Sequence, residues 1–147
     1  MKAQVRDGLE CVVNGRSVAV AVSAVDRLIE YQVSPPLPLS QPWVGGLGVE
    51  GGLVFVSLRL AQGAGNESSR KGVLFVSQHG SMRWTLEVDG VKGVVEVQET
   101  DGEAARVGDG WTCPPRWLVP ARSGERALAW LDLADVEATL RAQQGAR

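Results

Sequence analysis

Residues 38–58 read Pro-Leu-Ser-Gln-Pro-Trp-Val-Gly-Gly-Leu-Gly-Val-Glu-Gly-Gly-Leu-Val-Phe-Val-Ser-Leu. Prolines lead into a glycine-dense turn, and an apolar run, residues 53–60, leads out of it. Residues 46–51 also satisfy the Gly-x-Gly-x-x-Gly fingerprint of dinucleotide sites. That fingerprint binds pyrophosphate only between a strand and a helix, because the helix N-terminus supplies the N–H groups. Here a strand follows the glycines, so the stretch predicts a structural turn between strands.

The dominant hydrophobic period of the chain is two, which indicates strands rather than helices. Asn14-Gly15 separates two apolar segments, 9–13 and 17–22. Both residues tolerate the positive φ of a type I′ turn, so this region predicts a hairpin. Residues 53–60 alternate in the same way, and one side of that strand is expected to face a core while the other is mixed.

The same alternation continues in the second half of the chain. Segments 73–77 and 82–88 have strand character, and Asp89-Gly90 is expected to turn the chain back into a further strand at 91–98. Short antiparallel strands in succession predict a small barrel or a sandwich. The chain is therefore expected to be mainly β.

Two loops and one helix interrupt this pattern. Residues 62–72 are rich in Gly, Ser, Asn and charge, which predicts a surface loop joining two halves, and residues 99–110 read as a second loop. Residues 132–143 predict a short C-terminal helix, with Asp132 as its N-cap. Its apolar stripe consists of Leu133, Val136 and Leu140.

The length and composition are those of an ordinary globular chain, either one domain or two very small units packed together. It has 147 residues, 44% hydrophobic and 22% charged, with a net charge of -2. That charge gives no electrostatic footprint for nucleic acid or an anionic membrane. The N-terminal residues 1–8 contain no apolar core of signal-peptide length, and two cysteines are too few for a disulfide framework. A cytoplasmic location is expected.

No residue pattern in the chain predicts catalysis, a metal site or a cofactor. The only histidine, His79, lies in a predicted turn, and Cys11 and Cys113 belong to no Cys-x-x-Cys pair and are expected to be packed and inert. Two acidic pairs lie next to turns, where carboxylates are common for turn geometry and solubility: Glu87 with Asp89, and Asp101 with Glu103.

The five tryptophans are scattered and form no stacking ladder for nucleic acid. Trp84 and Trp130 lie in predicted strands and are expected in the core. Trp43, between Pro42 and Gly45, remains open between a core position and a surface groove. Because tryptophan is enriched in binding hot spots, Trp43 counts as a candidate contact residue.

Several segments occur in the order in which one known family has them. Val25-Asp26-Arg27-Leu28-Ile29 stands where that family has a valine, an acid and an isoleucine. Trp43-Val44-Gly45-Gly46-Leu47, Val88-Asp89-Gly90-Val91 and Ala127-Leu128-Ala129-Trp130-Leu131-Asp132-Leu133 match later family segments. In this order and spacing the chain resembles CheW-like domains, the coupling proteins of bacterial chemosensory arrays.

This resemblance implies two small five-stranded SH3-like barrels packed side by side, with a groove between them and a short C-terminal helix. We expect a single CheW-like domain over residues 1–147, with approximate halves 9–61 and 72–131 and the helix at 132–143. The implied function is that of a non-enzymatic chemotaxis adaptor or scaffold. Its implied partners are the cytoplasmic hairpin tip of a chemoreceptor (methyl-accepting chemotaxis protein), the regulatory domain of a CheA-type histidine kinase, and other CheW-like proteins. These interactions would recruit the protein to receptor arrays.

The resemblance also suggests candidate receptor-binding residues. Val25, Asp26 and Arg27 match the segment implicated in receptor contact, and Gly48-Val49-Glu50-Gly51 matches the family's Asn-Leu-Arg-Gly. Glu50 and Gly51 are therefore candidates, together with Trp43, while kinase-facing residues stay unassigned. Glu50 reverses the charge of the family's arginine, so a carboxylate partner kept by ordinary relatives would be repelled.

Two alternatives remain open at this stage. The chain could be a divergent accessory CheW-like protein, as in gliding-motility systems, that binds a receptor but not the kinase, and Glu50 favours this version. It could instead be a small β-barrel enzyme or ligand-binding protein that uses the turn at residues 45–52 and one carboxylate. No cofactor is expected in the adaptor interpretation.

Overall fold

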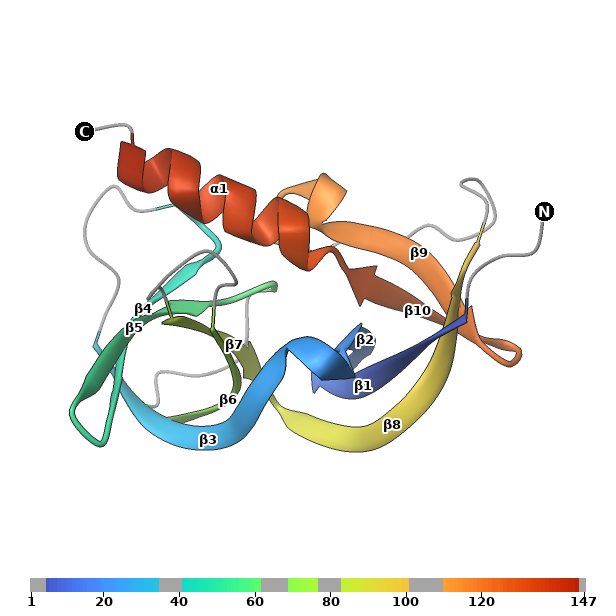
Figure 1. Ribbon diagram of the computed structural model, residues 1–147, viewed down its shortest axis with the longest axis horizontal. Helices are drawn as coiled ribbons and strands as arrows, with labels where there is room; N and C mark the ends of the chain where they lie inside the picture. The colour runs from blue at the N-terminus through green and yellow to red at the C-terminus, as the bar shows by residue number, and fades with distance from the viewer. Residues whose placement is uncertain (1–4, 35–40, 62–68, 77–82, 101–109, 146–147) are drawn as a thin grey trace.

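The computed structural model describes residues 5–34, 41–61, 69–76, 83–100 and 110–145. It contains two closed five-stranded barrels side by side, with one helix running over them (Figure 1). This architecture confirms the fold expected from the sequence. The predicted turn around His79, the pair Asp101 and Glu103, and most of both predicted loops lie outside the described residues.

One barrel, here called the terminal barrel, is built from the two ends of the chain. Its strand order is β1-β2-β10-β9-β8. The β1–β2 turn is the predicted hairpin, with φ of 49° at Asn14 and 78° at Gly15. The strands are β1 (Val5–Val13), β2 (Arg16–Ala21), β8 (Gly90–Glu99), β9 (Leu118–Ser123) and β10 (Arg126–Leu131).

The other barrel, here called the central barrel, lies between these two parts of the sequence. A 3-10 turn, η1 (Val22–Ala24), leads into it, and its strand order is β3-β4-β5-β7-β6. Its strands are β3 (Val25–Ser34), β4 (Val44–Glu50), β5 (Leu53–Leu58), β6 (Ser69–Val76) and β7 (Arg83–Val88). Because β6 begins at Ser69, the loop predicted for residues 62–72 is too long at its C-terminal end.

The barrels do not correspond to the expected halves 9–61 and 72–131. Strand β1 pairs with β8, so the N-terminal hairpin closes a barrel with strands from the last third of the chain. The predicted hairpin at Asp89-Gly90 is also wrong, because β7 and β8 belong to different barrels. Asp89 crosses between them: its carboxylate accepts a hydrogen bond from the Asn14 N–H, and its own N–H donates to the Val12 carbonyl, both at 2.7 Å.

The glycines of the opening stretch lie mostly within a strand rather than in a turn. Gly45 and Gly48 belong to β4, and Gly51-Gly52 alone form the β4–β5 turn. A Cβ at Gly45 would overlap the Glu87 carboxylate, and one at Gly48 would overlap the Phe55 ring. A five-stranded barrel has little internal volume, so β4 lacks side chains where its neighbours fill the interior.

The interior of the central barrel is partly polar. The alternation of apolar and polar residues along β5 and β7 did not predict this. On β5, Phe55 and Ser57 are buried inside the barrel, while Val54 on the opposite side is 64% exposed. On β7 the polar residues Thr85 and Glu87 are buried. The expectation that Glu87 serves turn geometry and solubility is therefore wrong, because its strand position directs it into the barrel.

A continuous apolar core joins the barrels and the helix. It includes buried side chains of both barrels and of helix α1 (Leu133–Gly145), where Val136 and Leu140 are buried as predicted. Asp132 caps the helix by accepting the Asp135 N–H at 3.2 Å. Trp43 packs on Trp117 in this core, with ring centroids 5.1 Å apart.

Candidate functional site

The buried carboxylate of the central barrel belongs to a closed polar network. Glu87 accepts hydrogen bonds from Ser57 at 2.7 Å and Arg59 at 3.1 Å, and lies 3.5 Å from Arg70. The Tyr31 hydroxyl bonds Ser57 at 2.8 Å, and burial raises the pKa of Tyr31 to about 12. These groups satisfy one another in a low-dielectric interior, so the network stabilises the barrel and offers no free acid or base.

The terminal barrel has a comparable buried carboxylate. Glu10 is 1% exposed and receives a bidentate pair from Arg126, at 2.6 and 2.9 Å. Ser17 donates to it at 2.6 Å, and Lys92 lies 3.7 Å away. The Arg126 hydrogen bond outweighs the desolvation of the carboxylate and holds the pKa of Glu10 at about 2. Glu10 thus stays ionised and paired.

Neither cysteine is suited to nucleophilic chemistry. Both are buried free thiols. Burial, with a smaller contribution from the Glu10 charge, raises the pKa of Cys11 to about 12, and burial raises that of Cys113 to about 11. A thiol needs a lowered pKa to act as a nucleophile near neutral pH, and these two pKa values are raised. Both cysteines are packed in the interior, as expected.

Among the receptor-binding candidates, three charged side chains come together at one edge of the central barrel. Arg27 Nη2 lies 3.0 Å from Glu50 Oε1, and Arg27 Nε lies 3.6 Å from Asp26. Gly51 follows directly in the β4–β5 turn with φ of 55°. Residues distant in sequence thus form one cluster, and the carboxylate of Glu50 is balanced by a cation of its own chain.

The other two candidates are not part of this charged cluster. Val25 is half-buried and packs against the shared core. Trp43 is 5% exposed, which corrects its possible surface placement. The flanking proline and glycine suggested an exposed turn, but the residue begins the approach to β4, where its indole fills the space beside Trp117.

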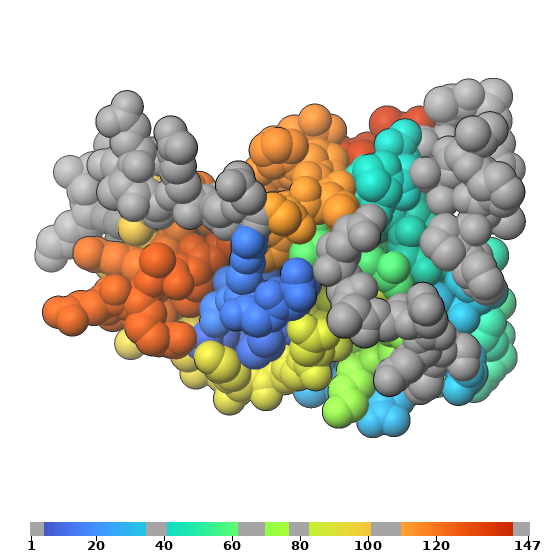
Figure 2. Space-filling view, turned by 180° about the vertical axis from the view of Figure 1, so that it is seen from behind, coloured from blue at the N-terminus to red at the C-terminus, as the bar shows by residue number. Residues whose placement is uncertain are grey.

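A groove of about 360 Å³ lies where the two barrels meet. Strands β3, β6 and β7 of the central barrel form one wall, and the first residues of β8 form the other. Leu28 and Val91 are 53% and 37% exposed there. Figure 2 shows the β7 and β8 atoms, in yellow, adjoining the green and blue atoms of the central barrel. The remaining lining residues are Ile29, Glu30, Lys71, Gly72, Val88 and Gly90.

Sequence reasoning did not assign these groove residues a role. Leu28 and Val91 stand inside the two segments quoted for the family resemblance, directly beside Arg27 and Gly90. In the structure both of these apolar side chains are exposed rather than buried. Exposure depends on strand register and on the contact between barrels, neither of which a local pattern contains.

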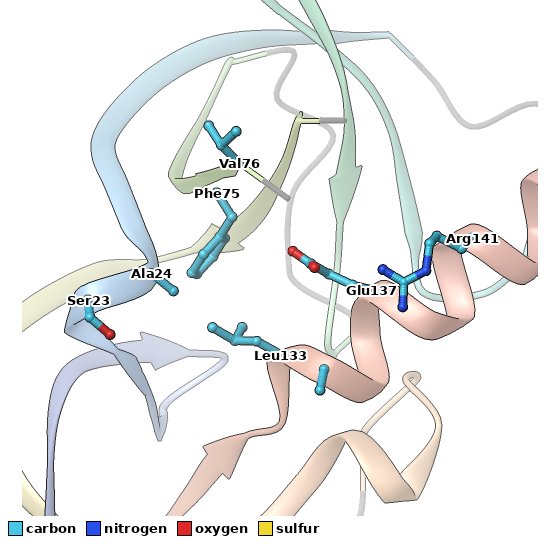
Figure 3. A pocket seen from close by; sticks show the side chains of 8 residues that line it. Ser23, Ala24, Phe75, Val76, Leu133, Glu137 and Arg141 are labelled. Atoms are coloured by element: carbon cyan, nitrogen blue, oxygen red, sulfur yellow. The ribbon is translucent and has the colours of Figure 1, made fainter. Parts of the chain in front are cut away.

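A second cavity, of about 310 Å³, opens between η1, the end of β6 and helix α1. Figure 3 shows Phe75 and Leu133 on its apolar side and Glu137 and Arg141 reaching it from the helix. Glu137 also accepts a hydrogen bond from the Trp84 indole at 3.3 Å. Among the described residues that line it, the ionisable side chains are those of Glu137 and Arg141.

The described residues contain no group of three or more His, Cys, Asp or Glu placed to hold a metal ion. Among the same residues, the helix is too short and too polar to cross a bilayer.

Comparison with known proteins gave a family and a fold. The model of the CheW-like domain matches residues 7–139, a range that includes strands of both barrels. The crystal structure of the scaffolding protein TtCheW from Thermoanaerobacter tengcongensis superposes with a TM-score of 0.60 at 11% sequence identity, covering 90% of this chain and 87% of that one. No curated protein matches the chain in sequence.

Proposed function

This chain belongs to the CheW-like family, and on that premise we propose that it is a non-enzymatic adaptor of a chemosensory array. It binds the cytoplasmic hairpin tip of a chemoreceptor in the cytoplasm and couples that receptor to a CheA-type histidine kinase. Other CheW-like domains, including the kinase's own, are further partners. Its effect on the kinase comes from assembly rather than from turnover.

The groove between the barrels is the observation that carries this proposal. Exposed Leu28 and Val91 flank a floor that includes buried Val88. An apolar stripe on a partner helix fits such a groove, because residues three and four positions apart in a helix lie on one face. The shared core supports this use, since it joins the two walls into one packed unit.

Filling the groove should weaken receptor binding without harming the fold. A Cβ at Gly90 meets nothing within 4 Å, and its backbone does not have a positive φ, so Gly90→Leu places its side chain in the groove at little cost in stability. We expect receptor affinity to fall by roughly tenfold or more, since bulk in an interface centre blocks packing of the partner helix. Co-sedimentation with the receptor's cytoplasmic hairpin, alone and with the kinase, measures this.

Gly90→Ala is the matched control, and it should retain most of the binding of the wild type. If Gly90→Leu sediments with the receptor as the wild type does, while its thermal unfolding is unchanged, the groove is not the receptor site. If the wild type sediments with the receptor but not with the kinase, the chain is an accessory protein of the family. Binding to neither partner would overturn the proposed function.

The cluster Asp26, Arg27, Glu50 and Gly51, with neighbouring Val25, is proposed as a further receptor-contact region. Trp43 is not included, because its indole is buried. The Arg27–Glu50 pair is half exposed, at 50% and 27%, so its contribution to stability is small, about 0.5 kcal/mol.

Glu50→Arg should therefore change partner selection with little effect on folding. The substitution places two cations together, which lowers stability by less than about 1 kcal/mol and presents the opposite charge to a partner. We expect kinase binding to increase relative to the wild type, measured by titration calorimetry with the kinase's regulatory domain. The double exchange Arg27→Glu with Glu50→Arg restores the internal pair and serves as control. A variant that unfolds, while the double exchange folds normally, would show that the pair is structural.

A further inference from the structure

The groove carries one acidic and one basic side chain in direct register. Glu30 of β3 is the cross-strand partner of Lys71 of β6, and both residues are exposed and line the groove. Opposite charges at such positions attract each other and commonly pair. Within the part of the chain that the structure describes, however, neither side chain forms an ion pair.

Two nearby charged residues, in contrast, form ion pairs. Arg27, on the same strand as Glu30, is paired with Glu50 and Asp26. Lys92, which follows Val91 on the opposite wall, is paired with buried Glu10. Glu30 and Lys71 are thus the two charged residues of the groove lining, and neither is paired with another charge in the described chain. A partner bound against Leu28 and Val91 would contact both of them.

We infer that Glu30 and Lys71 select the helix that the groove accepts and fix its direction. This inference rests on the proposed function and deepens it. The partner is an amphipathic helix with an apolar stripe, a basic residue facing Glu30 and an acidic residue facing Lys71. Cross-strand neighbours have Cβ atoms about 4.5–5.5 Å apart, and helix residues at i and i+4 about 5–6 Å apart. On a helix whose axis follows the line from Glu30 to Lys71, the two partner charges therefore lie three or four positions apart.

The order of the two charges determines the direction of the helix. A helix running the opposite way would bring its basic residue to Lys71 and its acidic residue to Glu30, and like charges in contact oppose binding. The apolar contacts alone do not distinguish the two directions, because a stripe of similar apolar residues makes similar contacts whichever way the helix runs. Charge thus supplies orientation, while Leu28, Val88 and Val91 supply the apolar contact.

The test exchanges the two charges. The double variant Glu30→Lys with Lys71→Glu keeps the net charge and the cross-strand complementarity, so its folding should match that of the wild type. Its affinity for the receptor's cytoplasmic hairpin, measured by titration calorimetry, should fall by roughly tenfold or more. The loss should shrink as salt rises from about 0.05 to about 0.3 M, since exposed charges are screened. A hairpin whose facing acidic and basic residues are exchanged should recover the affinity.

An equivalent exchange on another surface is the control. Arg6 and Glu99 form an exposed pair at 3.8 Å on the terminal barrel, and Arg6→Glu with Glu99→Arg should leave receptor affinity unchanged. If the wild type binds the hairpin and the Glu30/Lys71 exchange binds it equally well, the inference is wrong and the proposed function stands. If the folded wild type does not bind the hairpin, the proposed function fails and the inference fails with it.

Discussion

Gly46→Ala is expected to destabilise the protein by about 3 to 5 kcal/mol, the largest loss for any single methyl group added to β4. Gly46 has φ of 133°, a conformation that an L-residue rarely adopts, at the point where the β4–β5 register shifts. A Cβ there would overlap the backbone carbonyl oxygen of Ser34. Ser34 cannot move away without breaking its pairing with Leu47, so the closure of the central barrel is lost.

Thermal unfolding followed by circular dichroism measures this effect. A chain of this size should lose roughly 10 °C or more in Tm. Gly90→Ala is the matched control, because its added methyl group meets open space and its φ is ordinary, so its Tm should stay within about 2 °C of the wild type. A Gly46→Ala protein that unfolds at the temperature of the wild type would show that β4 tolerates a side chain at this bulge.

Glu10→Gln is expected to cost about 2 to 3 kcal/mol at pH 7. The folded pKa of Glu10, about 2, lies below its ordinary value of 4.5, so the ionised form is favoured by folding. A carboxyl group with a lowered pKa stabilises the fold above its unfolded pKa, and this contribution disappears as pH falls from about 4.5 to about 2. The amide cannot accept the bidentate pair from Arg126 that the carboxylate accepts.

Urea unfolding at pH 7 and at about pH 3 measures how much Glu10 contributes to the free energy of unfolding and in which direction this contribution changes with pH. The gap in free energy of unfolding between wild type and Glu10→Gln should narrow at the lower pH, because the wild type loses part of the same contribution. Glu96→Gln, which removes an exposed carboxylate from β8, should change stability by less than about 0.5 kcal/mol at either pH. A Glu10→Gln gap that is constant with pH would mean that its cost comes from packing alone.

Local signals in the sequence predicted the features that depend on a few neighbouring residues. Asn14-Gly15 forms the expected turn because both residues have positive φ. Asp132 caps the helix, and the stripe through Val136 and Leu140 packs into the core as the 3.6-residue period requires. The two-barrel fold followed from the resemblance rather than from these signals, and it is confirmed.

Features that depend on long-range pairing escaped prediction. Asp89-Gly90 has the composition of a hairpin turn, yet a hydrogen bond to Asn14, 75 positions away in the chain, makes it a crossing between barrels. The neighbours of Trp43 left open whether it is buried or exposed, and it is buried against Trp117. The resemblance implied a groove but not its lining residues, and it did not predict the contact between Arg27 and Glu50. Both arise where separate strands meet, and the register between two strands cannot be read from either strand alone.

The pairing of β1 with β8 has a consequence for how the chain reaches its native state. During synthesis all five strands of the central barrel leave the ribosome before β8 does, so that barrel can close first. The β1–β2 hairpin is made earlier but must wait, with Val18 and Val20 uncovered, until residues 90–131 arrive. Because β1 and β8 lie far apart in the sequence, closing the last barrel carries an entropic cost, and until it closes the N-terminal hairpin is open to misassociation and to chaperones.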